Sequence, residues 1–279
     1  MHSPAFPPAC RIPYSRVVPI PVALTIAGSD PSGGAGIQAD LKTFHQFGAY
    51  GEAVVTLLTV QNTTTVERVE CLRPDLVEQQ LRAVLADIPP QAIKTGALGG
   101  SDLISAIAGV LRDLTVPLVV DPVMVSKHGA QLIHDDAREA LIRKLLPRAA
   151  LLTPNLDEAS VLTGLNVTDV PSMKQAAERL AEMGACSVLV KGGHLKGDAV
   201  DVLLHGGKFL ELASARVATR STHGAGCTYS AAITAELARG TDLVSAVRRA
   251  KKFVTEAIRT APGLGRGAGP LNHFAGVET

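Results

Sequence analysis

The sequence predicts an α/β protein of three layers (α-β-α), with helices on both faces of a mostly parallel central sheet. Short apolar runs alternate with amphipathic stretches between residues 22 and 258, and most apolar runs lack polar alternation. Such continuous runs are typical of parallel strands that are buried on both faces. Residues 199–217 differ, because a Gly206-Gly207 turn separates two runs there. This pattern predicts an antiparallel hairpin that extends the sheet near the C-terminal third.

Apolar spacing and the residues that interrupt it set the expected elements. Strands are expected over residues 22–27, 54–60, 92–95, 117–120, 150–153 and 187–190, followed by the hairpin strands 200–204 and 209–217. Helices are expected over residues 74–87, 102–114, 135–146, 155–163 and 172–183, up to Gly240 after the second glycine-rich turn, and from Asp242 onward. A further helix follows the glycine-rich residues 28–36, and four apolar side chains share its face: Ile37, Leu41, Phe44 and Phe47.

Composition indicates a globular chain with one domain and no strong field. The chain has 279 residues, 46% of them hydrophobic and 19% charged, and its 27 Lys and Arg against 26 Asp and Glu leave a formal charge of +1. This balance gives no reason to expect nucleic acid or a membrane as a partner. Residues 22–270 contain neither a linker nor a repeat, so residues 22–279 are predicted to form one domain.

The N-terminal residues and the cysteines suggest a compartment. Residues 1–21 hold six prolines and no apolar core, which predicts a disordered leader rather than a secretory signal. The four cysteines are far apart and form no CxxC pair, so we expect neither a disulfide framework nor a zinc site. No apolar run reaches the ~18 residues of a membrane helix. The cytoplasm is therefore the predicted compartment.

Polar residues gather where the expected strands end. Asp121, Asn155 with Glu158, and Lys191 each follow a strand, and the Gly224–Cys227 turn follows the hairpin. In an open parallel sheet, ligands bind beyond the carboxyl ends of the strands. Two acids, an amide and a lysine beside a helix start predict a magnesium-nucleotide site.

The turn at residues 224–227 has the features of an anion site. Gly224 and Gly226 bend the backbone and let a ligand approach, and a helix begins at this point. The first N–H groups of a helix, together with its dipole, attract negative charge. Cys227 lies in that first turn, where its thiolate would be favoured. The alternative is a plain helix entry with a buried, inert cysteine.

Asp40 is the one acid on the apolar face of the first helix: viewed down the helix axis, its side chain falls between those of Phe44 and Phe47. An acid buried alone is costly, so it needs a partner or a polar cavity. We expect it to face a ligand pocket, and the alternative is a bond to a nearby backbone N–H or lysine.

Two nucleotide-binding classes are disfavoured. Residues 34–39 fit a G-x-G-x-x-A fingerprint, but Gly28 to Gly33 separate them from the strand and Glu52 precedes the next strand instead of ending it. Both features argue against a nicotinamide or flavin oxidoreductase. No G-x-x-x-x-G-K-[ST] segment occurs, which excludes a P-loop NTPase.

Several blocks then resemble one family in the same order. Residues 27–40, beginning Ala27-Gly28-Ser29-Asp30, resemble the opening signature of hydroxymethylpyrimidine/phosphomethylpyrimidine kinases of the ribokinase-like superfamily. The further matching blocks are residues 61–63, 121–124, 153–158, 191–194, 222–227 and 265–270. The resemblance covers about residues 22–274, and its first block is long and specific.

The resemblance implies a ribokinase-like fold, an activity and site roles. Such enzymes use Mg²⁺ and ATP to phosphorylate 4-amino-5-hydroxymethyl-2-methylpyrimidine and then its monophosphate, in thiamine biosynthesis. By motif, the N–H groups of Ala225, Gly226 and Cys227, after Gly224, form the anion hole, and Cys227 stands where sugar kinases have an aspartate base. The implied magnesium and nucleotide residues are Asp121, Asn155, Glu158 and Lys191. The implied pyrimidine pocket holds Gly28, Ala35, Asp40, Gln61 and Ala97.

Departures from the family pattern keep rivals open. Ala97 replaces a usual methionine and widens the pocket, and Ala225 replaces a usual threonine. A pyridoxal or pyridoxine kinase of the same superfamily is the nearest rival, although Ser126 replaces the cysteine that some of these enzymes carry. A silent ligand-binding relative would have lost Cys227 or Glu158, and a sugar kinase would have Asp at 227. Relatives are commonly dimers, so a homodimer is expected.

Overall fold

The computed structural model describes residues 20–124, 129, 132 and 136–277. The predicted leader lies outside these residues except for its last two, and Ser126 lies outside them too. Within the described part of the chain, nine strands form one sheet in the order β3-β2-β1-β4-β5-β6-β7-β8-β9. The strands are β1 (Val22–Ser29), β2 (Tyr50–Gln61), β3 (Val66–Cys71), β4 (Ala92–Thr95), β5 (Leu118–Val120), β6 (Leu151–Leu152), β7 (Val188–Val190), β8 (Ala199–His205) and β9 (Lys208–Ser214).

Strand direction confirms the mostly parallel sheet and the hairpin. Neighbours from β2 through β1 to β7 pair in parallel, whereas β8 and β9 pair antiparallel at one edge. The hairpin turns at Gly206 and Gly207, which have φ of 56° and 72°. Positive φ values at adjacent residues favour glycine and suit the tight turn of a hairpin.

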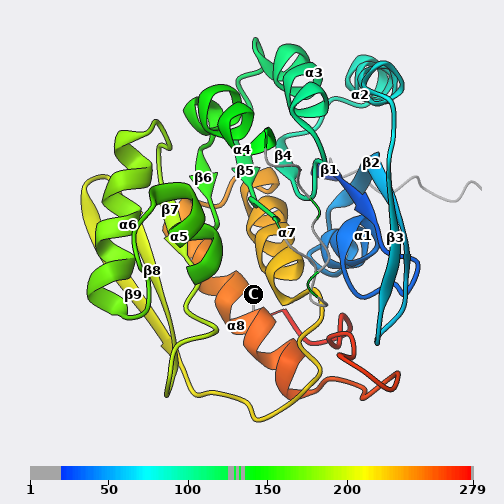
Figure 1. Cartoon of the computed structure of the whole chain (residues 1–279). Helices are drawn as coiled ribbons and strands as arrows, with labels where there is room; N and C mark the ends of the chain where they lie inside the picture. The colour runs from blue at the N-terminus through cyan, green and yellow to red at the C-terminus, as the bar shows by residue number, and fades with distance from the viewer. Residues whose placement is uncertain (1–19, 125–128, 130–131, 133–135, 278–279) are drawn as a thin grey trace, which may run out of the picture.

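Helices cover both faces of the sheet, which confirms the three layers (Figure 1). The helices are α1 (Gly36–Gln46), α2 (Pro74–Asp87), α3 (Ser101–Leu111), α4 (Ala137–Ala140), α5 (Leu156–Thr163), α6 (Val170–Glu182), α7 (Ala225–Ala238) and α8 (Leu243–Arg259). One apolar core joins the sheet to α2 through α6, and the other joins it to α1, α7 and α8. Adjacent strand residues supply opposite cores, as Val119 and Val120 do.

Helix α7 is central in its layer and lies in the middle of the molecule (Figure 1). Every residue from Thr228 to Glu236 is buried, so the helix has no solvent face. Small side chains such as Ala231 and Ala232 let α1 and α8 pack closely on either side. The N-terminus of α7 is thereby held in one position at the edge of the sheet.

The elements differ from the expected ones at two places. Strand β3 was not expected, because Val66, Val69 and Cys71 alternate poorly with the charged residues between them; it forms by antiparallel pairing with the extended β2. The helix expected over residues 135–146 is also shorter. In the described residues the α-helical part is only α4. A π-helical turn over Leu141–Leu145 and a 3₁₀ turn over Leu146–Arg148 follow it. Pro147 has no N–H to continue an α-helix.

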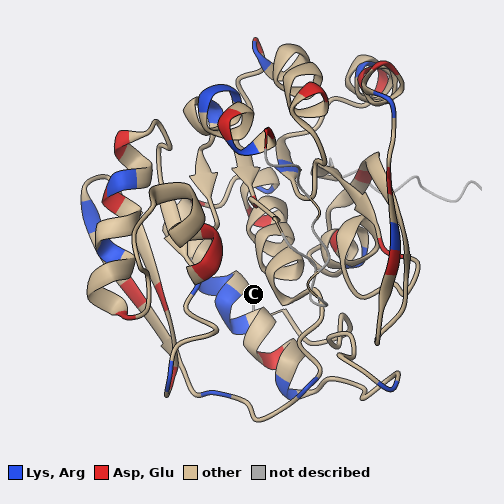
Figure 2. Cartoon of the chain, in the orientation of Figure 1, with Lys and Arg blue, Asp and Glu red and all other residues tan. Residues whose placement is uncertain are grey.

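The strand order reverses around β1, which lies between β2 and β4. A crevice opens at such a point beyond the carboxyl ends of the strands, where open α/β sheets bind ligands. Charged residues of both signs are interspersed along the helices and strands, in keeping with the formal charge of +1 (Figure 2). None of the helices in the described residues has the length and apolarity needed to cross a membrane.

Candidate active site

A cavity of about 880 Å³ lies at this crevice. The structure brings twelve of the thirteen predicted site residues to its wall: Gly28, Ala35, Gln61, Ala97, Asp121, Asn155, Glu158, Lys191, Gly224, Ala225, Gly226 and Cys227. Only Asp40 is not part of the lining. Residues from seven separate segments therefore meet in one space, at the edge where the parallel strands end.

The turn before α7 requires glycine at one position. Gly224 caps the helix with φ of 78°, in the left-handed region. A Cβ atom there would lie 1.8 Å from the carbonyl oxygen of Gly34. The turn thus lies directly against the glycine-rich loop that follows β1.

The N–H groups of the turn are not equivalent. Ala225 N–H already donates to the carbonyl of Thr222, at 3.2 Å. Gly226 and Cys227 follow in the first helical turn, where N–H groups have no partner within the helix. A Cβ on Gly226 would lie 3.1 Å from Lys191 Nζ, so the lysine reaches the mouth of this turn. The N–H groups of Gly226 and Cys227, together with the Lys191 ammonium, are the donors at this turn that could hold an anion.

Cys227 differs from the expected thiolate. Burial raises the pKa of its thiol to about 11, and this outweighs the lowering effect of Lys94. The carboxylates of Asp40 and Asp121 raise the pKa further, and a backbone hydrogen bond with Gly36 lowers it. Cys227 is half-buried and lines the cavity, and burial is the largest cause of the raised pKa. At neutral pH the side chain is a thiol.

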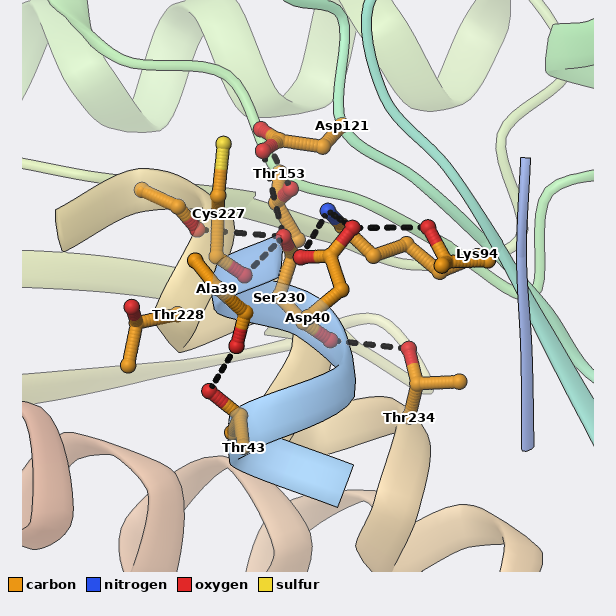
Figure 3. A network of polar contacts seen from close by, with 12 residues as sticks. Ala39, Asp40, Thr43, Lys94, Asp121, Thr153, Cys227, Thr228, Ser230 and Thr234 are labelled. Carbon is orange, nitrogen blue, oxygen red and sulfur yellow. Dashed lines mark hydrogen bonds and ion pairs between the residues drawn. The ribbon is translucent and has the colours of Figure 1, made fainter. Parts of the chain in front are cut away.

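Asp121 and Lys191 form the charged centre of the cavity. Lys191 Nζ lies 2.8 Å from Asp121 Oδ1. Thr153 and Ser230 donate hydroxyl hydrogen bonds to the same carboxylate, both at 3.1 Å (Figure 3). Burial would raise the pKa of Asp121, but Lys191 and Lys94 outweigh it and hold that pKa below its usual value. Asp121 is therefore ionised, and Lys191, whose pKa is raised by Asp121 and Glu158 against the effect of burial, is charged.

Asn155 and Glu158 form a reciprocal cap at the start of α5. Asn155 Oδ1 accepts from the Glu158 N–H and Glu158 Oε2 accepts from the Asn155 N–H, both at 2.8 Å. Burial raises the pKa of Glu158 to about 7 despite the nearby Lys191. The described residues contain no group of three or more His, Cys, Asp or Glu arranged to bind a metal. Asp121 and Glu158 are oxygen donors, which suits Mg²⁺ that keeps waters and phosphate ligands.

Asp40 pairs with a lysine, which is the alternative to a ligand pocket that the sequence left open. Its carboxylate accepts from Lys94 Nζ at 2.7 and 2.8 Å and from the Thr25 hydroxyl at 2.6 Å. Asp40 and Lys94 are both 0% exposed. The acid is thus satisfied by an ion pair inside the protein instead of facing the cavity. Figure 3 shows this pair close to the start of α7.

A second polar cluster was not singled out from the sequence. His223 Nε2 lies 2.8 Å from Asp30 Oδ2 and 3.1 Å from Gln61 Nε2, at the wall of the cavity. Asp30 and His223 stand in two of the matched blocks, but they are 193 residues apart. No local pattern pairs them, and only the contact between the two blocks brings them together.

The chain matches the family model described as phosphomethylpyrimidine kinase over residues 30–272. It is 45% identical to a hydroxymethylpyrimidine/phosphomethylpyrimidine kinase of Synechococcus elongatus, covering 91% of this chain and 98% of the relative. The chain belongs to the phosphomethylpyrimidine kinase family. It is also 49% identical to the thiamine biosynthesis bifunctional protein ThiED of Geobacter sulfurreducens, over 95% of this chain but only 55% of that protein.

Solved structures confirm the ribokinase-like fold of the family. A phosphomethylpyrimidine kinase from Clostridium difficile aligns with a TM-score of 0.76 and 45% identity, over 86% of this chain and all of that chain. A pyridoxal kinase from Staphylococcus aureus in complex with AMP-PCP and pyridoxal aligns with a TM-score of 0.85 and 38% identity, over 92% and 95% of the two chains. The family resemblance found in the sequence is confirmed.

Proposed function

We propose that this protein transfers phosphate from ATP to the hydroxymethyl group of 4-amino-5-hydroxymethyl-2-methylpyrimidine, and then phosphorylates the monophosphate, in thiamine biosynthesis. The observation that carries the proposal is the meeting of the α7 N-terminus, Lys191 and Asp121 with Gln61 in one cavity. The α7 N-terminus and Lys191 are suited to a phosphoryl group, and Asp121 is suited to the Mg²⁺ that accompanies it. The Gln61 amide is suited to hydrogen bonding with an aminopyrimidine.

The chain supplies positioning and charge. In-line phosphoryl transfer through a loose transition state depends mainly on alignment and on neutralising the charge that spreads over the phosphoryl oxygens. The N–H groups of Gly226 and Cys227 and the Lys191 ammonium are the groups proposed for that task. The neutral Cys227 thiol is proposed to orient the substrate hydroxyl, which needs little activation in such a reaction.

Mg²⁺ that arrives with ATP would neutralise phosphate charge, and Asp121 and Glu158 are the residues proposed to hold it or its waters. Asn155 is proposed to contact the nucleotide. Its Oδ1 already accepts the hydrogen bond from the Glu158 N–H that caps α5. The substrate side is proposed to contain Gly28, Ala35, Gln61 and Ala97. Asp40 is proposed to act there indirectly, through its ion pair with Lys94.

A direct assay tests the function. Purified protein with Mg²⁺ and ATP is offered hydroxymethylpyrimidine, its monophosphate and pyridoxal in parallel, and products are separated by chromatography. We expect turnover of both pyrimidines. No product from either one would overturn the proposal. Pyridoxal is included because a structural relative is a pyridoxal kinase of 38% identity, and product from pyridoxal alone would favour that second function.

A homodimer and a cytoplasmic location remain part of the proposal. Strand β2 exposes the apolar side chains of Tyr50, Leu58 and Val60, and exposed apolar side chains are of the kind that a second copy covers. Light scattering of the purified full chain measures its mass directly. The cysteines Cys71, Cys186 and Cys227 are free thiols, which suits a reducing compartment.

A further inference from the structure

The contacts of His223 bear on which end of the Gln61 amide faces the substrate. His223 is 3% exposed and follows directly on Thr222, just before the turn that starts α7. Its Nε2 atom is within hydrogen-bond distance of two side chains, Asp30 Oδ2 at 2.8 Å and the Gln61 amide at 3.1 Å. Because an imidazole nitrogen either donates or accepts, these two contacts constrain one another.

Asp30 decides the role of the imidazole nitrogen. Its carboxylate already accepts from the N–H and hydroxyl of Ser32, at 2.9 and 2.7 Å, and from the N–H of Ala35, at 2.8 Å. Burial alone would raise the pKa of Asp30, but its bonds to His223 and Ser32 hold the pKa below the usual value. A carboxylate surrounded by donors can only accept, so Nε2 of His223 must carry a hydrogen. This holds for the neutral ring and for the charged ring alike.

The Gln61 amide must then turn its oxygen to the histidine. With Gln61 Nε2 toward the ring, two N–H donors would face each other at 3.1 Å. A half-turn of the amide exchanges Oε1 and Nε2 at nearly the same positions, and the network of partners decides between the two. In the turned orientation, one Nε2–H is shared between Asp30 and Gln61 Oε1, and no donor opposes another.

We propose that His223 is a specificity-determining residue that holds Gln61 by its oxygen, so that the Gln61 NH₂ group faces the cavity and selects a ring with a hydrogen-bond acceptor. This inference rests on the proposed function. On an aminopyrimidine the acceptor is a ring nitrogen, whereas the amino group offers a donor. Gln61 therefore pairs with a ring nitrogen and leaves the amino group to other partners. The same histidine directly precedes Gly224, the first residue of the turn that starts α7.

A spectroscopic experiment tests the orientation without any assay. The full chain is labelled with ¹⁵N-histidine, and the His223 signals are assigned by their loss in His223→Gln. We expect Nε2 of His223 to stay protonated between pH 6 and pH 9. An unprotonated Nε2 at any pH in that range would contradict the proposal, since Gln61 could then donate to it.

A substrate pair tests the selection. Two pyridine analogues are compared with hydroxymethylpyrimidine, each with one ring nitrogen replaced by CH. For one of them we expect kcat/KM to fall about tenfold to 100-fold, the size of effect that an unpaired buried donor produces. The ratio of kcat/KM for hydroxymethylpyrimidine to kcat/KM for that analogue should shrink below about threefold in His223→Leu. It should persist in His223→Gln, whose amide can still donate to Asp30 and Gln61. An unchanged ratio in a folded His223→Leu protein, or no loss with either analogue, would overturn the proposal.

Gln61→Glu is a second variant in case His223→Leu does not fold. A carboxylate keeps the acceptor for His223 but has no donor for the ring, so the ratio between pyrimidine and analogue should fall while the His223 Nε2–H signal remains. Retention of the full ratio in Gln61→Glu would contradict the inference. If the wild-type protein phosphorylates neither pyrimidine, the proposed function fails, and the ¹⁵N measurement still decides how His223 holds Gln61.

Discussion

The ammonium of Lys94 on β4 lies 2.7 and 2.8 Å from the two carboxylate oxygens of Asp40 on α1, and neither side chain is exposed to solvent. Two opposite charges that are buried together stabilise each other, but one left alone has no compensation. The pair joins the sheet to a helix of the layer that contains α7. It also contributes to the electrostatics of Cys227, because Lys94 lowers and Asp40 raises the pKa of that thiol.

Lys94→Met should destabilise the fold by about 3–5 kcal/mol, because it leaves the Asp40 carboxylate buried and unpaired. Urea unfolding followed by circular dichroism measures this free energy. The double variant Lys94→Met with Asp40→Asn should lose less than Lys94→Met alone, since no uncompensated charge remains. Simple addition of the two single losses would contradict this account.

Cys227→Ala should lower kcat about 100-fold, because the substrate hydroxyl loses the side chain proposed to orient it for in-line attack. The Kd for ATP should change less than about threefold, because Lys191 and the N–H groups of the turn remain. Steady-state kinetics and calorimetric titration measure the two quantities. Cys186→Ala, at an exposed position, is the matched control. Unchanged turnover in Cys227→Ala would remove the cysteine from the mechanism.

Gly224→Ala should cost roughly 2 kcal/mol or more of stability and most of the turnover. Alanine is strained at a φ of 78°, and its Cβ would meet the Gly34 carbonyl at 1.8 Å, so the turn and the loop would have to separate. Thermal melting and kcat report the two effects. Gly109→Ala is the control, because a Cβ there meets nothing within 4 Å inside α3, and it should stabilise by about 0.5–1 kcal/mol. Equal melting temperatures for the two variants would contradict the prediction.

His273 should make the fold less stable in mild acid. Burial, with a smaller contribution from Lys42, lowers its pKa in the folded state to about 4, against 6.5 in the unfolded chain. Between these values the unfolded state binds more protons, so stability falls as pH drops below about 7. The loss between pH 7.5 and pH 5 should be about 2 kcal/mol. Urea unfolding of wild type and His273→Gln at both pH values isolates this part, and identical pH slopes would refute it.

The positions of many cavity-lining residues could be predicted from the sequence, because they follow from short sequence patterns. Asp121, Asn155, Glu158 and Lys191 directly follow apolar runs, and parallel topology brings the ends of such runs to one edge. The start of α7 could also be predicted, since glycines ahead of an Ala-rich run mark a helix start. The hairpin around Gly206 was equally local.

Tertiary contacts decided the rest. Asp40 has its partner 54 residues away on β4, so the sequence predicted a need for compensation but not Lys94. The thiolate expected from the position of Cys227 is absent, because burial raises the pKa of the thiol to about 11 and the carboxylates of Asp40 and Asp121, far away in sequence, raise it further. Strand β3 depends on pairing with β2 more than on its own pattern.

The sequence by itself determined the layers, the sheet edge at which the cavity lies and the family of kinases, because periodicity and motifs are local properties of the chain. The tertiary structure alone decided the protonation state of Cys227 and the ion pair of Asp40 with Lys94. It also decided the contacts of His223 with Asp30 and Gln61. Those depend on burial and on contacts between distant segments, and neither is encoded at the spacing of a few residues.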